Sequence, residues 1–334
     1  MDQFDLSTPG AFASARLDPN ETEDTGGLKC ELKTYEARYN SAGVRTILQA
    51  GTKRVEKKPR ERDHDSALVL ATYYKVDGVV DYTELEVRSP HIRAALRAVI
   101  KEYPGMAFDT GKIVIRNEPR CLFHYRNELR EYGLTLDDQV AVKHLVFLLN
   151  YMYRSLESEI SSYYTFMESP SIAPGVEYKN LWMAFRPGDF IYTKLDDTEK
   201  VLRLKSTSKS YFSWMLIAEE IQYNGTDFGY YSVSLRIYEY DGYKPLESLR
   251  AYPLQHHKRK EAITNSLITR GKKFLGLRGI HHRYYEGLAD SLSPFRQNTI
   301  DGEEDEYAIQ SIMVSLLIES ICGLTKERRS RVVS

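Results

Sequence analysis

Two pairs of adjacent histidines carry the side chains in this chain that are best suited to hold a metal ion. They are His256-His257 and His281-His282. Neighbouring side chains on a strand point to opposite faces, so one pair cannot chelate a single ion through both rings. A shared site needs one ring from each pair together with a carboxylate such as Glu286. We expect surface or half-buried imidazoles instead, and therefore predict no metal and no cofactor.

A second group with chemical potential is His124 with Arg126 and Glu128, which has the residue types of an acid–base site. We expect it to be an ordinary cluster on a helix surface. The chain lacks the motifs Gly-x-x-x-x-Gly-Lys-Ser/Thr, Gly-x-Gly-x-x-Gly, Gly-x-Ser-x-Gly and His-Glu-x-x-His. The nearest phosphate-loop candidate, residues 270–273, lies in a helical pattern whose backbone N–H groups cannot cradle a phosphate. We predict no catalytic residue and no enzyme activity, with a hidden hydrolase as the third hypothesis.

The strongest candidate for binding is a basic and aromatic run between residues 250 and 285. It holds nine Lys or Arg residues against one acid, Glu261. This combination is typical of single-stranded nucleic-acid binding on barrel-type folds. It fits equally well a contact with an acidic protein surface, including the chain's own acidic residues 301–306. The predicted interaction face consists of Lys258, Arg259, Lys260, Arg270, Lys272, Lys273, Arg278, His281, His282, Arg283, Tyr284 and Tyr285.

Bulk properties favour a protein partner over nucleic acid, and an intracellular protein, cytoplasmic or nuclear. The formal net charge is −1, which argues against extensive nucleic-acid binding. The three cysteines are far apart and odd in number, so we expect reduced thiols and no disulfide framework. The N-terminus lacks the basic and apolar regions of a secretory signal. The most apolar window, residues 309–324, is too short and too polar to span a membrane.

The elements that must position these residues form two domains in a predicted α+β fold. Residues 1–27 are predicted to be a disordered tail and residues 52–65 a charged loop. Residues 28–169 form the N-terminal α+β domain, in which Ser89-Pro90 starts a helix. The predicted strands cover residues 29–37, 44–49, 67–76, 82–87 and 113–115, and further helices cover residues 120–132 and 136–166, the last as one long helix.

The second domain, residues 176–289, is predicted to be an antiparallel sheet or a small barrel-like domain with one packed helix. The helix carries Ile263, Leu267 and Phe274 on one face, and a final strand covers residues 279–287. Trp182 and Phe185 lie at i and i+3 before Pro187-Gly188, and we expect both to be buried anchors. Residues 290–334 are predicted to be an acidic linker and a C-terminal helix over 307–322. The other predicted strands are 190–195, 201–205, 214–223 and 230–240.

Several phrases of the sequence resemble a known arrangement. Residues 181–188, Leu-Trp-Met-Ala-Phe-Arg-Pro-Gly, are similar to a phrase of an uncharacterised domain that precedes the ATPase module in filamentous-fungal AAA+ ATPases. Residues 270–274 and 281–287 resemble the closing phrase of that domain. Residues 29–33, 85–90 and 123–129 are similar as well, so the resemblance covers about residues 28–289.

The resemblance implies a non-catalytic protein-interaction module that recruits a substrate or an adaptor. The ATPase motifs of that family lie further along the chain, and this sequence does not contain them. We therefore expect a truncated gene product or a shortened gene model. The resemblance specifies neither the partner nor the oligomeric state. The alternative hypothesis is a nucleic-acid-binding module that uses the basic and aromatic face of residues 250–285.

Overall fold

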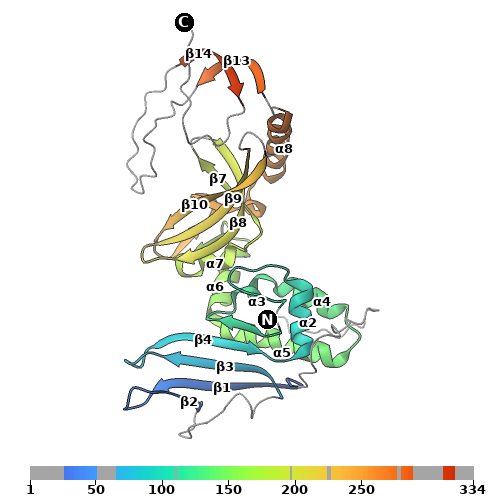
Figure 1. Cartoon of the computed structure of the whole chain (residues 1–334), viewed down its shortest axis with the longest axis vertical. Helices are drawn as coiled ribbons and strands as arrows, with labels where there is room; N and C mark the ends of the chain where they lie inside the picture. The colour runs from blue at the N-terminus through green and yellow to red at the C-terminus, as the bar shows by residue number, and fades with distance from the viewer. Residues whose placement is uncertain are drawn as a thin grey trace.

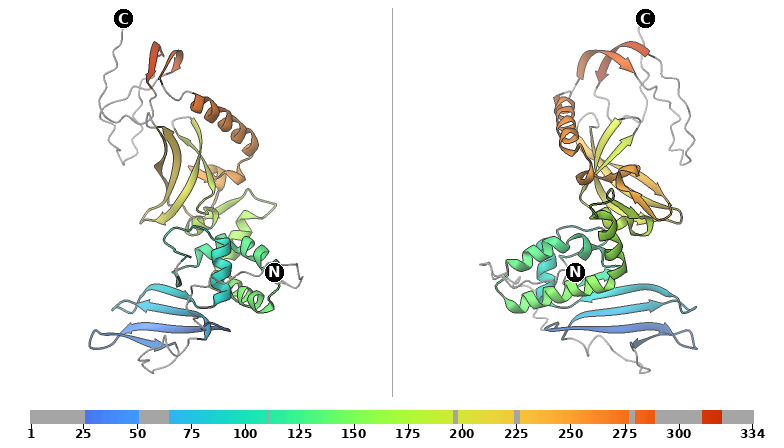
Figure 2. Two further views of the ribbon diagram at one scale, coloured as in Figure 1. Left: turned by 45° about the vertical axis from the view of Figure 1, so that its right-hand side comes forward. Right: turned by 180° about the vertical axis from the view of Figure 1, so that it is seen from behind.

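The computed structural model describes residues 26–50, 65–109, 111–195, 198–223, 227–276, 280–288 and 311–319, the last two stretches in their backbone only. The fold is mixed α+β, as the sequence predicts (Figure 1). Two five-stranded sheets lie one after the other along the longest axis, with a group of helices between them (Figure 2). Most of the predicted tail and of the predicted charged loop fall outside the described residues, as do residues 301–306, but Gly26 and Gly27 at the end of that tail are described and buried.

The first sheet has the strand order β2-β1-β3-β4-β5. Its strands pair antiparallel except for β1 and β3, which run parallel. Leu68 and Val87 form one cross-strand pair, and Val87 and Ile113 the next, so apolar side chains line up on the face that the helices cover. The strands are β1 (Lys29–Tyr39), β2 (Arg45–Gln49), β3 (Ser66–Tyr74), β4 (Val80–Val87) and β5 (Ile113–Arg116).

Five helices follow, and two of them begin at the caps that their sequences favour. Ser89 Oγ accepts a hydrogen bond from Ile92 N–H at 3.2 Å, which confirms the predicted start. Asp138 Oδ1 accepts one from Val140 N–H at 2.9 Å. The helices are α2 (Pro90–Val99), α3 (Arg120–His124), α4 (Arg126–Leu134), α5 (Gln139–Ser155) and α6 (Glu157–Met167).

The prediction of one continuous helix over residues 136–166 is wrong. The chain breaks at Leu156, where φ is −121° and ψ is 26°, outside the helical region. Leu156 is buried in the core at this point, and the bend brings α6 against β6 (Gly175–Glu177). A packed core position therefore overrides a helical pattern that the sequence alone would continue.

The second sheet has the order β10-β9-β8-β7-β12, antiparallel throughout. Its outermost strands do not pair with each other, so among the described strands it is an open sheet rather than a closed barrel. A small ribbon of β6 and β11 accompanies it. The remaining elements here are β7 (Phe190–Leu195), β8 (Thr198–Lys209), β9 (Ser213–Tyr223), β10 (Phe228–Tyr238), β11 (Tyr243–Pro245), β12 (Ala251–Pro253), and the short helices η1 (Tyr178–Asn180), α7 (Leu181–Ala184), η2 (Leu246–Ser248) and η3 (Leu254–His256).

Short helix α7 lies between the first group of helices and the second sheet, in contact with α3 and β6. Trp182 and Phe185 are both buried there, which confirms that they are anchors of the core. Buried apolar side chains form one continuous cluster from Ala67 in the first sheet to Tyr252 in the second. The domain boundary at residues 170–175 stays a prediction, although the core continues across it. Among the described residues, no helix has both the length and the apolar character needed to cross a membrane.

The last described elements are α8 (Lys260–Gly276), β13 (Ile280–Leu288) and β14 (Ser311–Glu319). The prediction of a helix over residues 307–322 is wrong, because residues 311–319 form a strand that pairs antiparallel with β13 over its whole length. The sequence Ser-Ile-Met-Val-Ser-Leu-Leu-Ile-Glu is rich in residue types that favour strands. A neighbouring strand, which the local periodicity cannot reveal, decides its conformation.

Candidate interaction face

Helix α8 is unusually exposed for its length. It has 17 residues, of which only Ile263 is buried. Phe274 is half-buried, and its ring meets that of Phe228 edge-on with 5.9 Å between centroids. On other turns of the helix Ile268 and Leu275 are 50% and 56% exposed. These two residues are seven apart, so they lie two turns from each other on one side of the helix.

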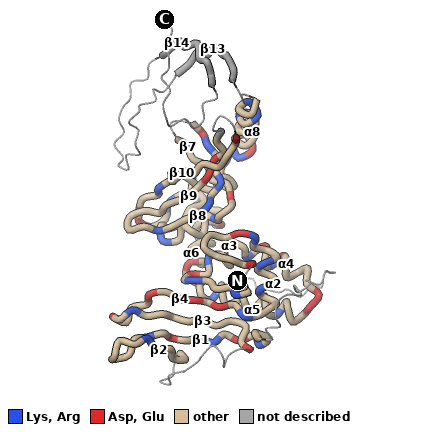
Figure 3. The backbone as a smooth tube through the Cα atoms, viewed as in Figure 1, with Lys and Arg blue, Asp and Glu red and all other residues tan. Residues whose placement is uncertain are grey.

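The cations of the predicted face divide into two groups. Three of them are already bonded within the chain: Lys258 Nζ lies 2.7 Å from Glu247 Oε2, Arg259 Nη2 lies 3.1 Å from Glu199 Oε1, and Arg270 Nη2 donates to the Glu199 carbonyl oxygen at 3.0 Å. Exposed Lys260, Lys272 and Lys273 form no ion pair with another described residue. The basic face is therefore narrower than the sequence suggests, although Lys and Arg mark both ends of α8 (Figure 3).

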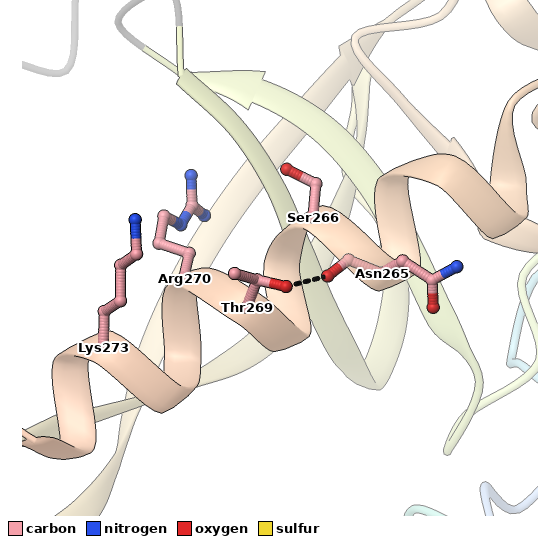
Figure 4. Close-up of a pocket in the computed structure, with 5 residues that line it drawn as sticks. All are labelled: Asn265, Ser266, Thr269, Arg270 and Lys273. Carbon is pink, nitrogen blue, oxygen red and sulfur yellow. Dashed lines mark hydrogen bonds between the residues drawn. The ribbon is translucent and has the colours of Figure 1, made fainter.

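A hollow of about 440 Å³ lies along α8 itself. Figure 4 shows Arg270 and Lys273 extending to the same side of the helix, with Ser266 nearby. Thr269 Oγ1 donates a hydrogen bond to the Asn265 carbonyl oxygen at 2.9 Å. All five lining residues come from one helix, so a carboxylate held by the two cations would keep much of its water. This arrangement can attract an anionic group but cannot enclose a substrate.

The side chains in the rest of the predicted face lie outside the described part of the structure. Arg278 lies outside the described residues. The backbone of β13 carries the others, and it pairs with β14. These residues are His281, His282, Arg283, Tyr284 and Tyr285.

The other histidine pair lies next to α8. His257 Nδ1 accepts a hydrogen bond from Arg259 N–H at 2.9 Å, and the His257 ring stacks on the Tyr252 ring with 5.8 Å between centroids. Burial lowers the pKa of the neighbouring His256. In the part of the chain that the structure describes, no group of three or more His, Cys, Asp or Glu side chains is arranged to hold a metal ion.

His124 does not lie on a helix surface, and the prediction that it does is wrong. Its side chain is buried, and the residue is 6% exposed. The ring links three segments: His124 Nδ1 lies 2.9 Å from Tyr103 Oη, and His124 Nε2 lies 2.8 Å from the Trp182 carbonyl oxygen. A carbonyl can only accept, so Nε2 carries the proton and the Tyr103 hydroxyl donates to Nδ1. The arrangement fixes the neutral tautomer.

The electrostatic environment of His124 opposes catalysis. Burial, together with the nearby Arg186 and Arg126 guanidinium groups, lowers its pKa to about 3. Burial likewise raises the pKa of the Tyr103 hydroxyl. Near neutral pH the pair therefore neither gains nor releases a proton. Its work is structural, since it ties α3 to α7 across the core.

A serine and a histidine also meet in the first domain. Ser89 Oγ lies 2.9 Å from His144 Nδ1, which is the distance of a nucleophile and its base. Both residues are buried, and the same hydroxyl accepts the cap hydrogen bond of α2. A substrate cannot reach this oxygen in the fold, so the pair is a buried cap rather than a hydrolase site.

A larger cleft of about 790 Å³ lies beside β5 and the end of β8. Its charges are compensated locally, since Arg116 Nη2 lies 3.1 Å from Glu84 Oε1 and Arg120 Nη2 lies 3.1 Å from Glu118 Oε2. The Arg120 guanidinium also lies over the Trp182 ring, 5.2 Å from its centroid. These contacts hold the cations in place and leave no concentrated positive field for a phosphate group.

Comparison with known proteins identifies one region. Residues 171–258 match a family model described as a domain of unknown function, DUF7025. The matched stretch includes the 181–188 phrase, α7 and the second sheet, and it ends just before α8. No curated protein and no solved structure matches the chain.

Proposed function

We propose that this chain is a non-catalytic protein-interaction module, similar to the N-terminal region of fungal AAA+ ATPases, that recruits a substrate or an adaptor. The observation that carries the proposal is the exposed side of α8. Ile268 and Leu275 present apolar surface there, and Lys272, four residues from Ile268 and so on the same side of the helix, adds charge beside it. An amphipathic helix of this kind fits an apolar groove with an acidic rim.

The match of residues 171–258 to DUF7025 supports the same proposal. It covers one of the phrases on which the resemblance to the AAA+-associated domain rests, residues 181–188. The polar groups with catalytic potential are buried and hydrogen-bonded within the fold: His124 bonds to Tyr103, and Ser89 bonds to His144. This supports a non-catalytic role. Steady ATP turnover that stays with the folded protein through purification would contradict that role.

Nucleic-acid binding is the rival function, and the exposed lysines of α8 are what favour it. Three of the cations in the predicted face are bonded to Glu199 or Glu247, which reduces the charge available for phosphates. Each phosphate contact releases counterions, so binding to single strands would weaken with salt at a logarithmic slope of about −0.7 per contact. Among the described cations of the face, only Lys260, Lys272 and Lys273 remain for phosphate contacts, so we expect a small salt slope and weak binding.

Site-specific photo-crosslinking tests the proposal. A benzophenone amino acid replaces Ile268 or Leu275, and the control carries it at Val140, which is 49% exposed on α5. We expect one protein to be crosslinked from both α8 positions and not from Val140. The double variant Lys272→Glu with Lys273→Glu should weaken that crosslink.

The same double variant separates the rival function. Binding of single-stranded RNA and DNA is measured at low and at physiological salt for the parent and the variant. We expect little binding by either protein at physiological salt. Micromolar or tighter binding by the parent that the variant loses would overturn the protein-interaction proposal in favour of nucleic acid.

A further inference from the structure

The second sheet ends in a long edge strand that nothing in the described part of the chain covers along its outer side. β10 spans Phe228–Tyr238 and pairs only with β9. The other edges of the two five-stranded sheets are short: β12 has three residues and ends at Pro253, β5 has four residues, and β2 has five. Natural proteins shorten or interrupt edge strands because an exposed edge invites another strand to pair. Among the edges of these two sheets β10, with eleven residues, is the exception (Figure 1).

β10 also lacks the other features that protect an edge. Its pairing with β9 runs through all eleven residues without a bulge. It contains no proline and a single charge, Arg236. Tyr230, Tyr231 and Tyr238 are 68%, 54% and 60% exposed, so the strand combines large apolar rings with an outer edge along which no other described strand pairs. Such an edge favours strand addition.

We propose that β10 pairs antiparallel with β10 of a second copy of this chain, about a two-fold axis through Val233. A two-fold axis normal to the sheet keeps each face on its own side, so an even-numbered residue must pair with an even-numbered one. Val233 is the midpoint of Phe228–Tyr238, and only this centre pairs all eleven residues. The product is one sheet of ten strands, five from each copy.

The side chains are self-complementary in this register. Arg236 lies opposite Tyr230 of the second copy, and both belong to the same face of the sheet because each is separated from Val233 by three residues. Within the described chain Arg236 makes no ion pair, so the opposing ring gives its guanidinium a cation–π partner. Ser232 lies opposite Ser234, and no like charges meet. The only charged side chain of β10 is Arg236, and in this register it lies opposite an aromatic ring. Such an edge favours a second copy over a charged peptide.

Charge substitutions at the two serines test both the dimer and its register. The parent should sediment as a dimer at micromolar concentration. Ser232→Lys with Ser234→Lys places lysines opposite each other twice and should raise the dissociation constant at least about tenfold. Ser232→Lys with Ser234→Glu places opposite charges together in the proposed register and should restore the dimer. Ser161→Lys, on an exposed position of α6, is the control and should stay dimeric.

A crosslink across the axis gives an independent measurement. Residues opposite each other in antiparallel strands have Cα atoms about 4.5–5.5 Å apart, within the range of a disulfide. Val233→Cys, in a background with Cys30→Ser and Cys322→Ser, should therefore form a covalent dimer with diamide, and Ser161→Cys in the same background should not. A monomeric parent would overturn the proposal and leave the edge to a strand of another protein. A dimer that the lysine pair leaves intact, or that the Lys–Glu pair fails to restore, would overturn it too.

Discussion

Replacement of His124 by glutamine tests how the two parts of the core are joined. His124 is buried and accepts a hydrogen bond from Tyr103 while donating one to the Trp182 carbonyl. Its ring also meets the Trp182 ring edge-on, with 5.6 Å between centroids. Glutamine cannot fill the space of the ring and can keep only part of this bonding. We expect His124→Gln to lower the free energy of unfolding by about 2–4 kcal/mol at neutral pH.

The pH dependence of that loss is the more specific prediction. The pKa of His124 is about 3 in the folded protein and 6.5 in the unfolded chain. Between these pH values the unfolded chain therefore binds a proton at His124 that the folded protein does not bind. Stability contributed by the neutral ring is therefore complete above 6.5 and falls as the pH drops towards 3. One pKa unit is worth about 1.4 kcal/mol, so the parent loses about 2 kcal/mol through His124 between pH 7 and pH 5. His124→Gln has no such loss.

Urea unfolding at the two pH values measures this difference. The stability gap between parent and His124→Gln should narrow by about 2 kcal/mol at pH 5, because all other titrating groups are shared. Tyr103→Phe is the matched control: it removes one hydrogen bond, costs about 1 kcal/mol and keeps the imidazole, so its curve should run nearly parallel to that of the parent. An equal gap for His124→Gln at both pH values would refute the neutral, buried histidine.

Two further substitutions test the packing of the core at Trp182 and the close approach of the N-terminal segment to Arg88 at Gly27. Trp182→Ala should cost about 3–5 kcal/mol, because the ring is buried and meets the Phe123 ring at 5.5 Å; an unchanged melting temperature would contradict this packing. Gly27→Ala should cost about 1–3 kcal/mol, since φ is +80° and a Cβ would lie 2.5 Å from the carbonyl carbon of Arg88. Thermal unfolding measures both, with the highly exposed Tyr211→Ala as the control that should change little. A stable Gly27→Ala variant would show that this segment does not pack on Arg88.

Much of the fold could be predicted because its signals are local. The alternation of residues 230–240 and the polar turn before it predict β10 and its pairing with β9, and the Ser89-Pro90 cap predicts the start of α2. Helix α5 and strand β14 show where local signals stop. Residues 136–166 continue a helical pattern through Leu156, and residues 311–319 suit both a helix and a strand. In each case a contact with a distant segment decides the outcome.

The candidate face could be predicted only in part, because contacts with distant segments of the chain also decide which of its cations are free. The cluster of cations near α8 is evident from the sequence. That Arg259 and Arg270 both reach Glu199, 60 and 71 residues away, is not, because no local pattern records such a contact. His124 is the clearest omission. Its neighbours Arg126 and Glu128 suggest a polar helix surface, and only the position of Trp182 explains why the imidazole is buried.

The two proposed surfaces can be separated because they lie at different places on the second sheet. Helix α8 contacts this sheet at Glu199 of β8 and at Phe228 of β10, and Phe228 is five residues from the proposed axis at Val233, or about 17 Å along a strand. Charges introduced at Ser232 and Ser234 should therefore disrupt the dimer without disturbing α8. A dimer presents two α8 helices, so a partner with several binding sites would bind it more tightly than a monomer without any new contact. The Ser232→Lys, Ser234→Lys variant should lose that gain and still be crosslinked from Ile268. Loss of both together would mean that β10 and α8 form one continuous surface.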